Sequence, residues 1–229
     1  MIDKILEEQS IVKQNKLREK ICLENKVDLN NLKYVAGVDL SYFGKDGEEF
    51  AVCCIVVIDY NTKEVIEKKH TKGKIDFPYI PGCLAFREMP LILETVEKLE
   101  IEPDLYVFDG NGYLHPRHMG IATHAGIVLN KPSIGVAKSY FKVHNTDYIE
   151  PNKEEGSYTD IIIKDEVYGR ALRTHRNVKP VFISVGNFVD IDTCTEIIKN
   201  LVTKESHIPI PTRIADLDTH EMRRKYNLL

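Results

Sequence analysis

Apolar and polar positions along the chain form two kinds of block, which predict strands and helices in turn. Mostly apolar runs of strand length predict buried β-strands at residues 34–42, 51–60, 105–109, 133–138, 169–174 and 181–185. Apolar residues at helical spacing predict helices at residues 84–99, 118–129 and 193–202, and an amphipathic surface helix within about the first thirty residues. The pattern therefore predicts an α/β protein: a mixed sheet with helices on both faces, in a single domain over residues 1–229.

A rigid aromatic loop precedes the first of the three central helices. In Pro78-Tyr79-Ile80-Pro81 the two prolines fix their own φ angles and bias the residues before them toward extended backbone. Such a loop can hold Tyr79 outward as a wedge. The helix that follows carries Glu88 on its apolar stripe, where a lone carboxylate costs several kcal/mol unless it is paired, protonated or bound to a cation. A partner such as Arg87 or a lysine at the helix rim, or a place in a functional site, would each explain it.

Two aspartates lie on predicted strands. Asp39 is near the end of the first strand, which pairs with its neighbour across the turn at residues 44–49. Asp109 ends another apolar strand, directly before Gly110, and ligands in open α/β sheets bind outside such carboxyl ends. Either aspartate alone fits a helix cap or a turn. Together with Glu88 they form an oxygen-rich set that suits Mg²⁺ or Mn²⁺ better than zinc.

A divalent cation held by carboxylates suits phosphodiester cleavage, because it stabilises the attacking and leaving oxygens. Lys138 ends the apolar strand that begins at Ser133. Its positive charge could stabilise a developing phosphorane or orient the attacking water. A solvated lysine at a strand end is the alternative interpretation.

A series of short motifs follows this acidic pattern in order along the chain. They are Val38-Asp39 with Ser41-Tyr42, residues 78–88, Pro103-Asp104, Asp109-Gly110-Asn111-Gly112, His115-Pro116-Arg117, residues 120–124, residues 134–138, Gly169, Arg173, residues 180–184, Pro209, Pro211-Thr212-Arg213 and Ala215-Asp216. Together they resemble the endonuclease V family over nearly all of the chain from about Tyr34 onward.

The resemblance implies an RNase H-like fold and a Mg²⁺-dependent endonuclease that acts at inosine. The implied cut is at the second phosphodiester bond 3′ to the deaminated base, leaves 5′-phosphate and 3′-hydroxyl ends, and initiates DNA repair. The implied catalytic residues are Asp39, Glu88, Asp109, Lys138 and Asp216. Of these, Asp39, Asp109 and Glu88 would bind the metal, Glu88 through water or directly.

The resemblance also implies a pocket for a flipped hypoxanthine. The implied substrate-binding residues are Pro78, Tyr79, Ile80, Pro81, Gly82, Leu84, Gly110, Gly112, His115 and Ile121. Tyr79 would separate bases around the lesion, and backbone groups at the glycines would approach the base closely because no Cβ intervenes. His115 would contact the strand near the cut. Flipping costs less at a mispaired or single-stranded inosine than at a sound pair.

Three positions depart from the family pattern. Asn187-Phe188 stands where many relatives have His-Arg, which leaves substrate preference and strand affinity open. His118 stands where many relatives have arginine. The histidine keeps a hydrogen-bond donor at this position, but its charge is titratable. Asp216 either joins the active centre or caps and solvates the final helix, with His220 one turn later on the same face.

Composition limits the setting in which the chain works. Its 229 residues are 43% hydrophobic, enough for a full core, and the longest apolar run, at residues 51–58, is far shorter than the roughly eighteen residues of a membrane span. The five cysteines are odd in number and lack zinc spacing, which favours reduced, mostly buried thiols. We therefore expect a cytoplasmic protein, monomeric and without a membrane partner.

The formal net charge of −4 argues against a sequence-blind nucleic-acid coat. Metal-dependent, salt-sensitive binding of single- or double-stranded inosine-containing DNA, and possibly RNA, remains compatible with it. The residues that could follow the phosphate backbone are Arg117, His118, Lys138, Lys142, Arg170, Arg173 and Arg176. Residues 145–160 are expected to form a solvated acidic loop.

Two other classes of function compete with this interpretation. One is an inosine reader that has lost its chemistry, which the presence of Asp39, Glu88 and Asp109 disfavours. The other is a different Mg²⁺ phosphotransferase or structure-directed nuclease on the same scaffold, because a fold alone does not fix function. The Tyr79 wedge and the glycine-lined pocket distinguish them, since cutting undamaged strands needs neither.

Overall fold

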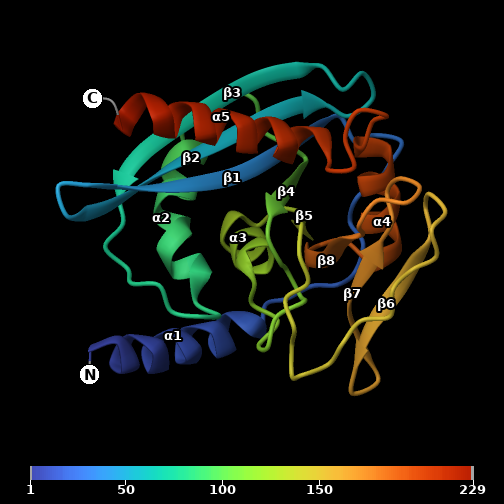
Figure 1. The fold of residues 1–229 in the computed structure, drawn as a ribbon, viewed down its shortest axis with the longest axis horizontal. Coiled ribbons are helices and arrows are strands. Elements are labelled where there is room, and N and C mark those ends of the chain that lie inside the picture. The colour runs from blue at the N-terminus through green and yellow to red at the C-terminus, as the bar shows by residue number, and fades with distance from the viewer. Residues whose placement is uncertain (1, 228–229) are drawn as a thin grey trace.

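In a computed structural model, which describes residues 2–227, the chain folds around one mixed eight-stranded sheet of order β3-β2-β1-β4-β5-β8-β7-β6 (Figure 1). The strands are β1 (Tyr34–Lys45), β2 (Glu48–Asp59), β3 (Val65–Lys74), β4 (Leu105–Asp109), β5 (Ser133–Ala137), β6 (Tyr158–Ile163), β7 (Glu166–Leu172) and β8 (Val181–Asn187). The helices are α1 (Ile2–Arg18), α2 (Leu84–Val96), α3 (Ile121–Leu129), α4 (Ile191–Leu201) and α5 (Ile210–Asn227).

Three parallel strands form the centre of the sheet. β1 pairs with β4 so that Val38 lies opposite Phe108, and β4 pairs with β5 so that Phe108 lies opposite Gly135. The other strand pairs are antiparallel. Residues that follow Val38 and Phe108 therefore meet at one place in the sheet, at the carboxyl end of β4.

Helices cover both faces of the sheet, as predicted (Figure 1). Val35 of β1 belongs to the apolar cluster that includes residues of α4 and α5. Its neighbour Ala36 belongs to a second cluster, formed with α2 and α3 on the other face. This alternation follows from the two-residue period of a strand, and it makes β1 a strand buried on both sides.

α5 packs unusually closely on β1, and Gly37 permits this contact. A Cβ atom on Gly37 would lie 2.1 Å from the carbonyl carbon of Pro211, near the start of α5. Any other residue would push the helix away from the strand. The glycine thus sets the height of α5 above the carboxyl end of the central strands.

Several element boundaries differ from the prediction. β3 and β6 were not predicted as strands, and β6 takes up the end of the expected acidic loop at 145–160. α3 begins at Ile121 and not at residue 118, because His118 has a φ of 57° in the left-handed region. The β1–β2 hairpin turns within two residues, Asp46 and Gly47, both at positive φ as in a type I′ turn.

Among the helices of residues 2–227, none is long and apolar enough to cross a membrane. The five cysteines are free thiols, four of them buried, as the sequence indicates.

Candidate active site

Strand register brings two aspartates together on the α5 face. Asp39 follows Val35 at even spacing on β1, and Asp109 follows Val107 in the same way on β4. Both valines belong to the cluster beneath α4 and α5, so that both carboxylates point toward α5. Lys138, directly after β5, contacts Asp109 from the third parallel strand. The predicted convergence of Asp39, Asp109 and Lys138 is present.

α5 supplies the third carboxylate. Ligand oxygens of Asp39, Asp109 and Asp216 all lie within 4.8 Å of one another, a group that fits around one metal ion. One turn further along α5, the buried Thr219 hydroxyl donates to Asp39 Oδ2 at 2.7 Å. The structure therefore places Asp216 beside Asp39 and Asp109, and its role in catalysis stays a prediction.

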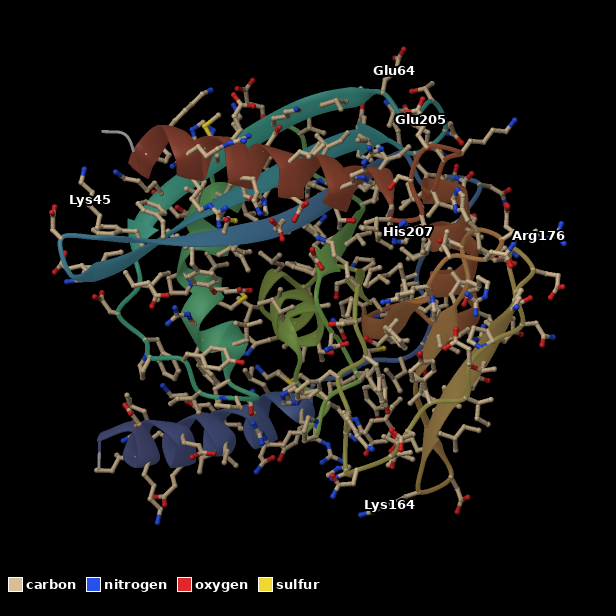
Figure 2. All side chains as sticks on the ribbon, in the orientation of Figure 1. Lys45, Glu64, Lys164, Arg176, Glu205 and His207 are labelled. Carbon is tan, nitrogen blue, oxygen red and sulfur yellow. The ribbon has the colours of Figure 1, made fainter. Side chains whose placement is uncertain are left out.

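The ammonium of Lys138 bridges two of these acids. Its Nζ lies 2.6 Å from Asp109 Oδ2 and 3.0 Å from Asp216 Oδ1. Burial lowers the pKa of Lys138, but the two carboxylates outweigh it and the pKa is raised overall. Sequence reasoning missed His207, in the loop before α5 (Figure 2), whose pKa is lowered by burial and by the charges of His175 and Lys138.

The charge of the centre favours a divalent cation. Three carboxylates against one ammonium leave two uncompensated negative charges when all groups are ionised. Asp39 is 9% exposed, and burial, followed by the charges of Asp109 and Asp216, raises its pKa to about 7 against the pull of Thr219 and Lys138. Ionising Asp39 fully therefore calls for more positive charge than Lys138 supplies. Clustered oxygen ligands of this kind suit a hard ion such as Mg²⁺ or Mn²⁺.

Glu88 belongs to α2, which packs on the opposite face of the sheet. It projects from α2, and Tyr42 of β1 donates its hydroxyl to Glu88 Oε1 at 2.7 Å. Burial, with the charge of Asp39, raises the pKa of Glu88 to about 7. Arg87 does not pair with Glu88, because it forms an ion pair with Glu49 at 2.5 Å. Glu88 lies outside the group of three, so its part in metal binding stays a prediction.

A cavity of about 170 Å³ lies beside the loop that holds Tyr79. It is lined by Tyr79, Ile80, Gly82, Leu84, Ala85, Asn111, His115, Met119, Gly120, Ile121 and Phe141. Six of these were predicted to bind substrate: Tyr79, Ile80, Gly82, Leu84, His115 and Ile121. The side chain of Tyr79 is 72% exposed, as a wedge requires. Among the lining residues that sequence reasoning missed, Phe141 had a detectable signal, since it follows the carboxyl end of β5.

Four predicted substrate-binding residues do not line this cavity. They are Pro78, Pro81, Gly110 and Gly112. A Cβ on Gly112 would lie 2.2 Å from the carbonyl oxygen of Val185. This glycine therefore lets the loop after β4 pack directly on β8. Gly110 has a φ of 155°, and its Cβ would lie 2.8 Å from the side chain of Ile121. In this structure both glycines serve close packing of the loop after Asp109.

A hydrogen-bond network fixes the cavity wall at Gly82. Its φ is 76°, and its carbonyl oxygen is 2.9 Å from Gln14 Nε2, 2.8 Å from Arg117 Nη2 and 3.1 Å from His115 Nε2. Gln14 comes from α1, 68 residues earlier in the chain, and is fully buried. No motif in the sequence points to this contact, since a glutamine in a charged helix reads as surface.

Two arginines predicted to follow the phosphate backbone do not do so. Arg170 and Arg173 are 4% and 5% exposed. Arg170 pairs with Asp160 and Asp192, while Arg173 pairs with Glu150. These side chains hold the β6–β7 region together, and the prediction that they contact nucleic acid is wrong.

Other residues predicted to follow the phosphate backbone are buried in the protein or lie at its periphery. His118 is 3% exposed and stacks on Tyr113 with ring centroids 3.9 Å apart, so its role as a strand donor is wrong as well. Lys142 pairs with Asp147 at 2.7 Å. Arg176 lies in the loop after β7, at the outer rim of the molecule (Figure 2).

The departure at residues 187–188 has a structural explanation. Asn187 Oδ1 accepts the backbone N–H of Cys22 at 3.0 Å, and the backbone N–H of Phe188 donates to the Cys22 carbonyl at 2.7 Å. The ring of Phe188 lies beneath the ammonium of Lys26, 3.8 Å from its centroid. These residues attach the segment after α1 to β8 and lie outside the acidic centre.

The sheet and its acidic centre define a class of protein. Carboxylates on two central parallel strands and on the helix that packs over them, with a lysine among them, on an RNase H-like sheet, are the machinery of a metal-dependent nuclease. The sequence model of the endonuclease V family matches residues 15–217. The chain belongs to the endonuclease V family, as its motifs predicted.

Individual relatives agree with this assignment. Endonuclease V of Bacillus thuringiensis subsp. konkukian (strain 97-27) is 57% identical over 222 residues, which cover 97% of this chain and 94% of the relative. The crystal structure of endonuclease V from Bacillus subtilis has a TM-score of 0.93 at 53% identity and covers 96% of this chain and 93% of that one. Endonuclease V of Ciona intestinalis, in complex with a 24mer DNA containing an inosine followed by a ribo-adenosine, has a TM-score of 0.84 at 31% identity, covering 97% of this chain and 99% of that one.

Proposed function

We propose that this endonuclease recognises inosine in nucleic acid and cleaves the second phosphodiester bond on its 3′ side. The products are 5′-phosphate and 3′-hydroxyl ends, and the cut initiates repair of deaminated adenine in DNA. The observation that carries the proposal is the cavity beside the exposed Tyr79. Asn111, two residues after Asp109 in the chain, lines this cavity and connects it to the acidic centre. A nuclease without a lesion to read needs no such cavity. The inosine in the DNA bound by the Ciona relative supports the same assignment.

Mg²⁺ is the proposed cofactor, with Mn²⁺ as a substitute. Asp39, Asp109 and Asp216 would hold the ion, since their oxygens form a compact, hard donor set, and Glu88 would complete the acidic centre. When bound, the ion stabilises charge on the reacting phosphate oxygens and promotes formation of hydroxide near neutral pH. Lys138 keeps a positive charge in the centre for the charge that develops on the phosphate.

The wedge and the cavity divide the work of recognition. Tyr79 separates the bases next to inosine, because it is held outward between two prolines and is free to insert. The cavity accepts the flipped base, and backbone groups at Gly82, Leu84 and Ile121 read its edges. Selectivity arises partly from the cost of flipping, which is lower for a mispaired or unpaired inosine than for a sound pair.

The proposed substrate is inosine-containing DNA, single- or double-stranded, and inosine-containing RNA is the second substrate. We further propose a monomer that works as one domain in the cytoplasm, where the five free thiols would stay reduced. The net charge of −4 makes binding weak without the metal and sensitive to salt.

Cleavage of end-labelled single-stranded DNA and RNA oligomers, each with one inosine or none, tests the proposal in Mg²⁺ and in EDTA. We expect a Mg²⁺-dependent cut 3′ of the inosine that Asp109→Ala abolishes. Glu64→Ala, in the exposed β2–β3 turn at the rim of the molecule (Figure 2), is the matched acid control and should cut like the unaltered protein. Equal cutting of inosine-free strands would overturn the recognition of inosine, and binding without cutting would favour an inactive reader.

A further inference from the structure

The imidazole of His115 has no ring nitrogen left for a substrate. Its Nδ1 accepts the backbone N–H groups of Arg117 at 3.1 Å and of Met119 at 3.2 Å. Nε2 must then carry the proton, which it donates to the Gly82 carbonyl at 3.1 Å. Burial, with the charge of Arg117, lowers the pKa of His115 to about 3, so the ring is neutral. What His115 can offer to the cavity is one face of a fixed, uncharged aromatic ring.

A second ring lies nearly parallel to it among the residues that line the same cavity. Phe141 lies in the segment between β5 and β6 and is 39% exposed. Its ring plane makes an angle of 16° with that of His115, and the ring centroids are 6.4 Å apart. Both residues line the cavity, together with Tyr79 and Gly82.

The distance between the two ring centroids is close to the separation that a third aromatic plane between them would need. Bases stack at about 3.4 Å, so one base between two rings needs about 6.8 Å. The observed centroid distance of 6.4 Å lies within the range for direct, offset aromatic pairs, so a base can enter between the rings only if one of them moves. Phe141 is partly exposed and on a loop, so it can supply that movement, while His115 is fixed by its three hydrogen bonds.

We propose that the flipped base is clamped between the faces of His115 and Phe141, and that Phe141 is a positioning residue for the base. This inference rests on the proposed function, because it assumes that a base enters the cavity. Stacking is tolerant of base identity, since every base has a π face. The clamp therefore supplies affinity for any base that is flipped, and the backbone groups around Gly82 supply the choice of inosine.

The test varies the protein and the base together. The variants are Phe141→Ala, Phe141→Tyr and, as an exposed control, Ile149→Ala at a side chain that is 73% exposed. Single-turnover cleavage of an inosine strand in Mg²⁺ gives the half-saturating enzyme concentration. An unlabelled strand with a tetrahydrofuran abasic site competes in the same assay and gives an inhibition constant without a base in the clamp.

We expect Phe141→Ala to raise the half-saturating concentration for the inosine strand by about 5- to 100-fold. The inhibition constant of the abasic strand should stay within about twofold, and Phe141→Tyr should restore the affinity. Equal weakening of both strands would overturn the clamp in favour of a contact with the strand backbone, and so would an unchanged affinity for inosine. Thermal unfolding of each variant checks the fold.

Failure of the clamp and failure of the proposed function give different results. If only the clamp is wrong, the unaltered protein still prefers inosine strands, and Phe141→Ala binds them as tightly. If the proposed function is wrong, the unaltered protein itself cuts inosine-containing and inosine-free strands alike. His115 is left unchanged in this design because its nitrogens hold the cavity wall.

Discussion

The buried amide of Gln14 donates to the carbonyl oxygen of Gly82 at 2.9 Å, and this bond ties α1 to the wall of the base cavity. Gln14 Oε1 also accepts from Arg117 Nε at 2.5 Å, and Arg117 Nη2 donates to the same Gly82 carbonyl. The three residues close a ring of hydrogen bonds around a backbone at positive φ. The family match begins at residue 15, so one member of this ring lies just outside it.

Replacing Gln14 tests whether α1 shapes the cavity. Gln14→Ala removes a buried donor and acceptor and leaves Arg117 with an unpaired N–H, so we expect a loss of about 1–3 kcal/mol in the free energy of unfolding. We also expect a higher KM for inosine strands with a smaller change in kcat, because the acidic centre is untouched. Urea unfolding and steady-state kinetics measure the two effects. Gln9→Ala, exposed on the same helix, is the control. If the variant is destabilised but its KM is unchanged, Gln14 serves the stability of the fold and not the shape of the cavity.

The wedge can be tested through the strandedness of the substrate. Tyr79 is 72% exposed, so Tyr79→Ala should change the free energy of unfolding by no more than about 0.5 kcal/mol. We expect it to slow cleavage at inosine in a duplex more than in a single strand, because only the duplex must be opened. Comparing kcat/KM for matched single- and double-stranded oligomers measures this difference. Equal losses on both substrates would mean that Tyr79 contacts the strand without separating bases.

The acidic centre shows what a sequence can and cannot place. Asp109 was predictable as a site residue, because it stands at the carboxyl end of β4. Asp39 lies within β1, which continues to Lys45, and the parallel register of β1 with β4 brings it beside Asp109. Which of Glu88 and Asp216 joins the two aspartates was not predictable, since a sequence does not say which face of the sheet a helix covers. α5 packs on the face toward which Asp39 points, while α2 packs on the other. Asp216 therefore enters the compact group of carboxylates, and Glu88 instead meets Tyr42.

Edge strands and buried charges were the other limits of prediction. β3 reads Val-Ile-Glu-Lys-Lys-His-Thr-Lys-Gly-Lys, with no apolar run, because one side of an edge strand is open to solvent. Arg170 looks like a phosphate ligand in the sequence, but its partners Asp160 and Asp192 lie 10 and 22 residues away. Only the tertiary structure shows that their charges are already matched.

The raised pKa values of the acids predict how stability depends on pH and metal. Asp39 and Glu88 each have a pKa of about 7, above their ordinary values of 3.8 and 4.5. Between about pH 4 and 7 these two acids hold protons in the folded protein that the unfolded chain has released, so their contribution to the free energy of unfolding falls as the pH rises. Buried histidines act in the opposite direction, because the lowered pKa values of His115 and His124, about 3 and about 4, leave them neutral where the unfolded chain is protonated. In EDTA we expect the Tm of the unaltered protein to decrease from pH 5 to pH 8 relative to the Tm of Asp39→Asn, and Mg²⁺ to raise the Tm of the unaltered protein more at pH 8 than at pH 5.

Asp39→Asn is the matched control for this pH dependence. The amide keeps the shape of the side chain but cannot ionise, so the variant lacks the contribution of Asp39 to the pH dependence of Tm in EDTA, and its gain in Tm from Mg²⁺ should be smaller. Thermal scans of both proteins over the same pH series give the comparison. A Tm difference between the two proteins that is the same at pH 5 and at pH 8 without metal would contradict the raised pKa of Asp39.

Thr219 offers a way to shift the pH profile of catalysis without touching a carboxylate. Its hydroxyl lies 2.7 Å from Asp39 Oδ2 and 2.9 Å from the Asp216 carbonyl oxygen, and the bond to Asp39 lowers the pKa of that acid. Thr219→Val has a similar volume and removes the donor, so the pKa of Asp39 should rise further. A hydrogen bond to a charged group contributes about 1.5–3 kcal/mol, which corresponds to a shift of about one to two pH units.

The acidic limb of the rate against pH reports this shift, because Asp39 must be ionised to hold the cation. We expect Thr219→Val to move the limb of kcat/KM to higher pH and to approach the rate of the unaltered protein at alkaline pH. Thr219→Ser restores the hydroxyl and should return the limb to its original position. A loss of activity that is equal at every pH would show that Thr219 supports the packing of α5 and not the ionisation of Asp39.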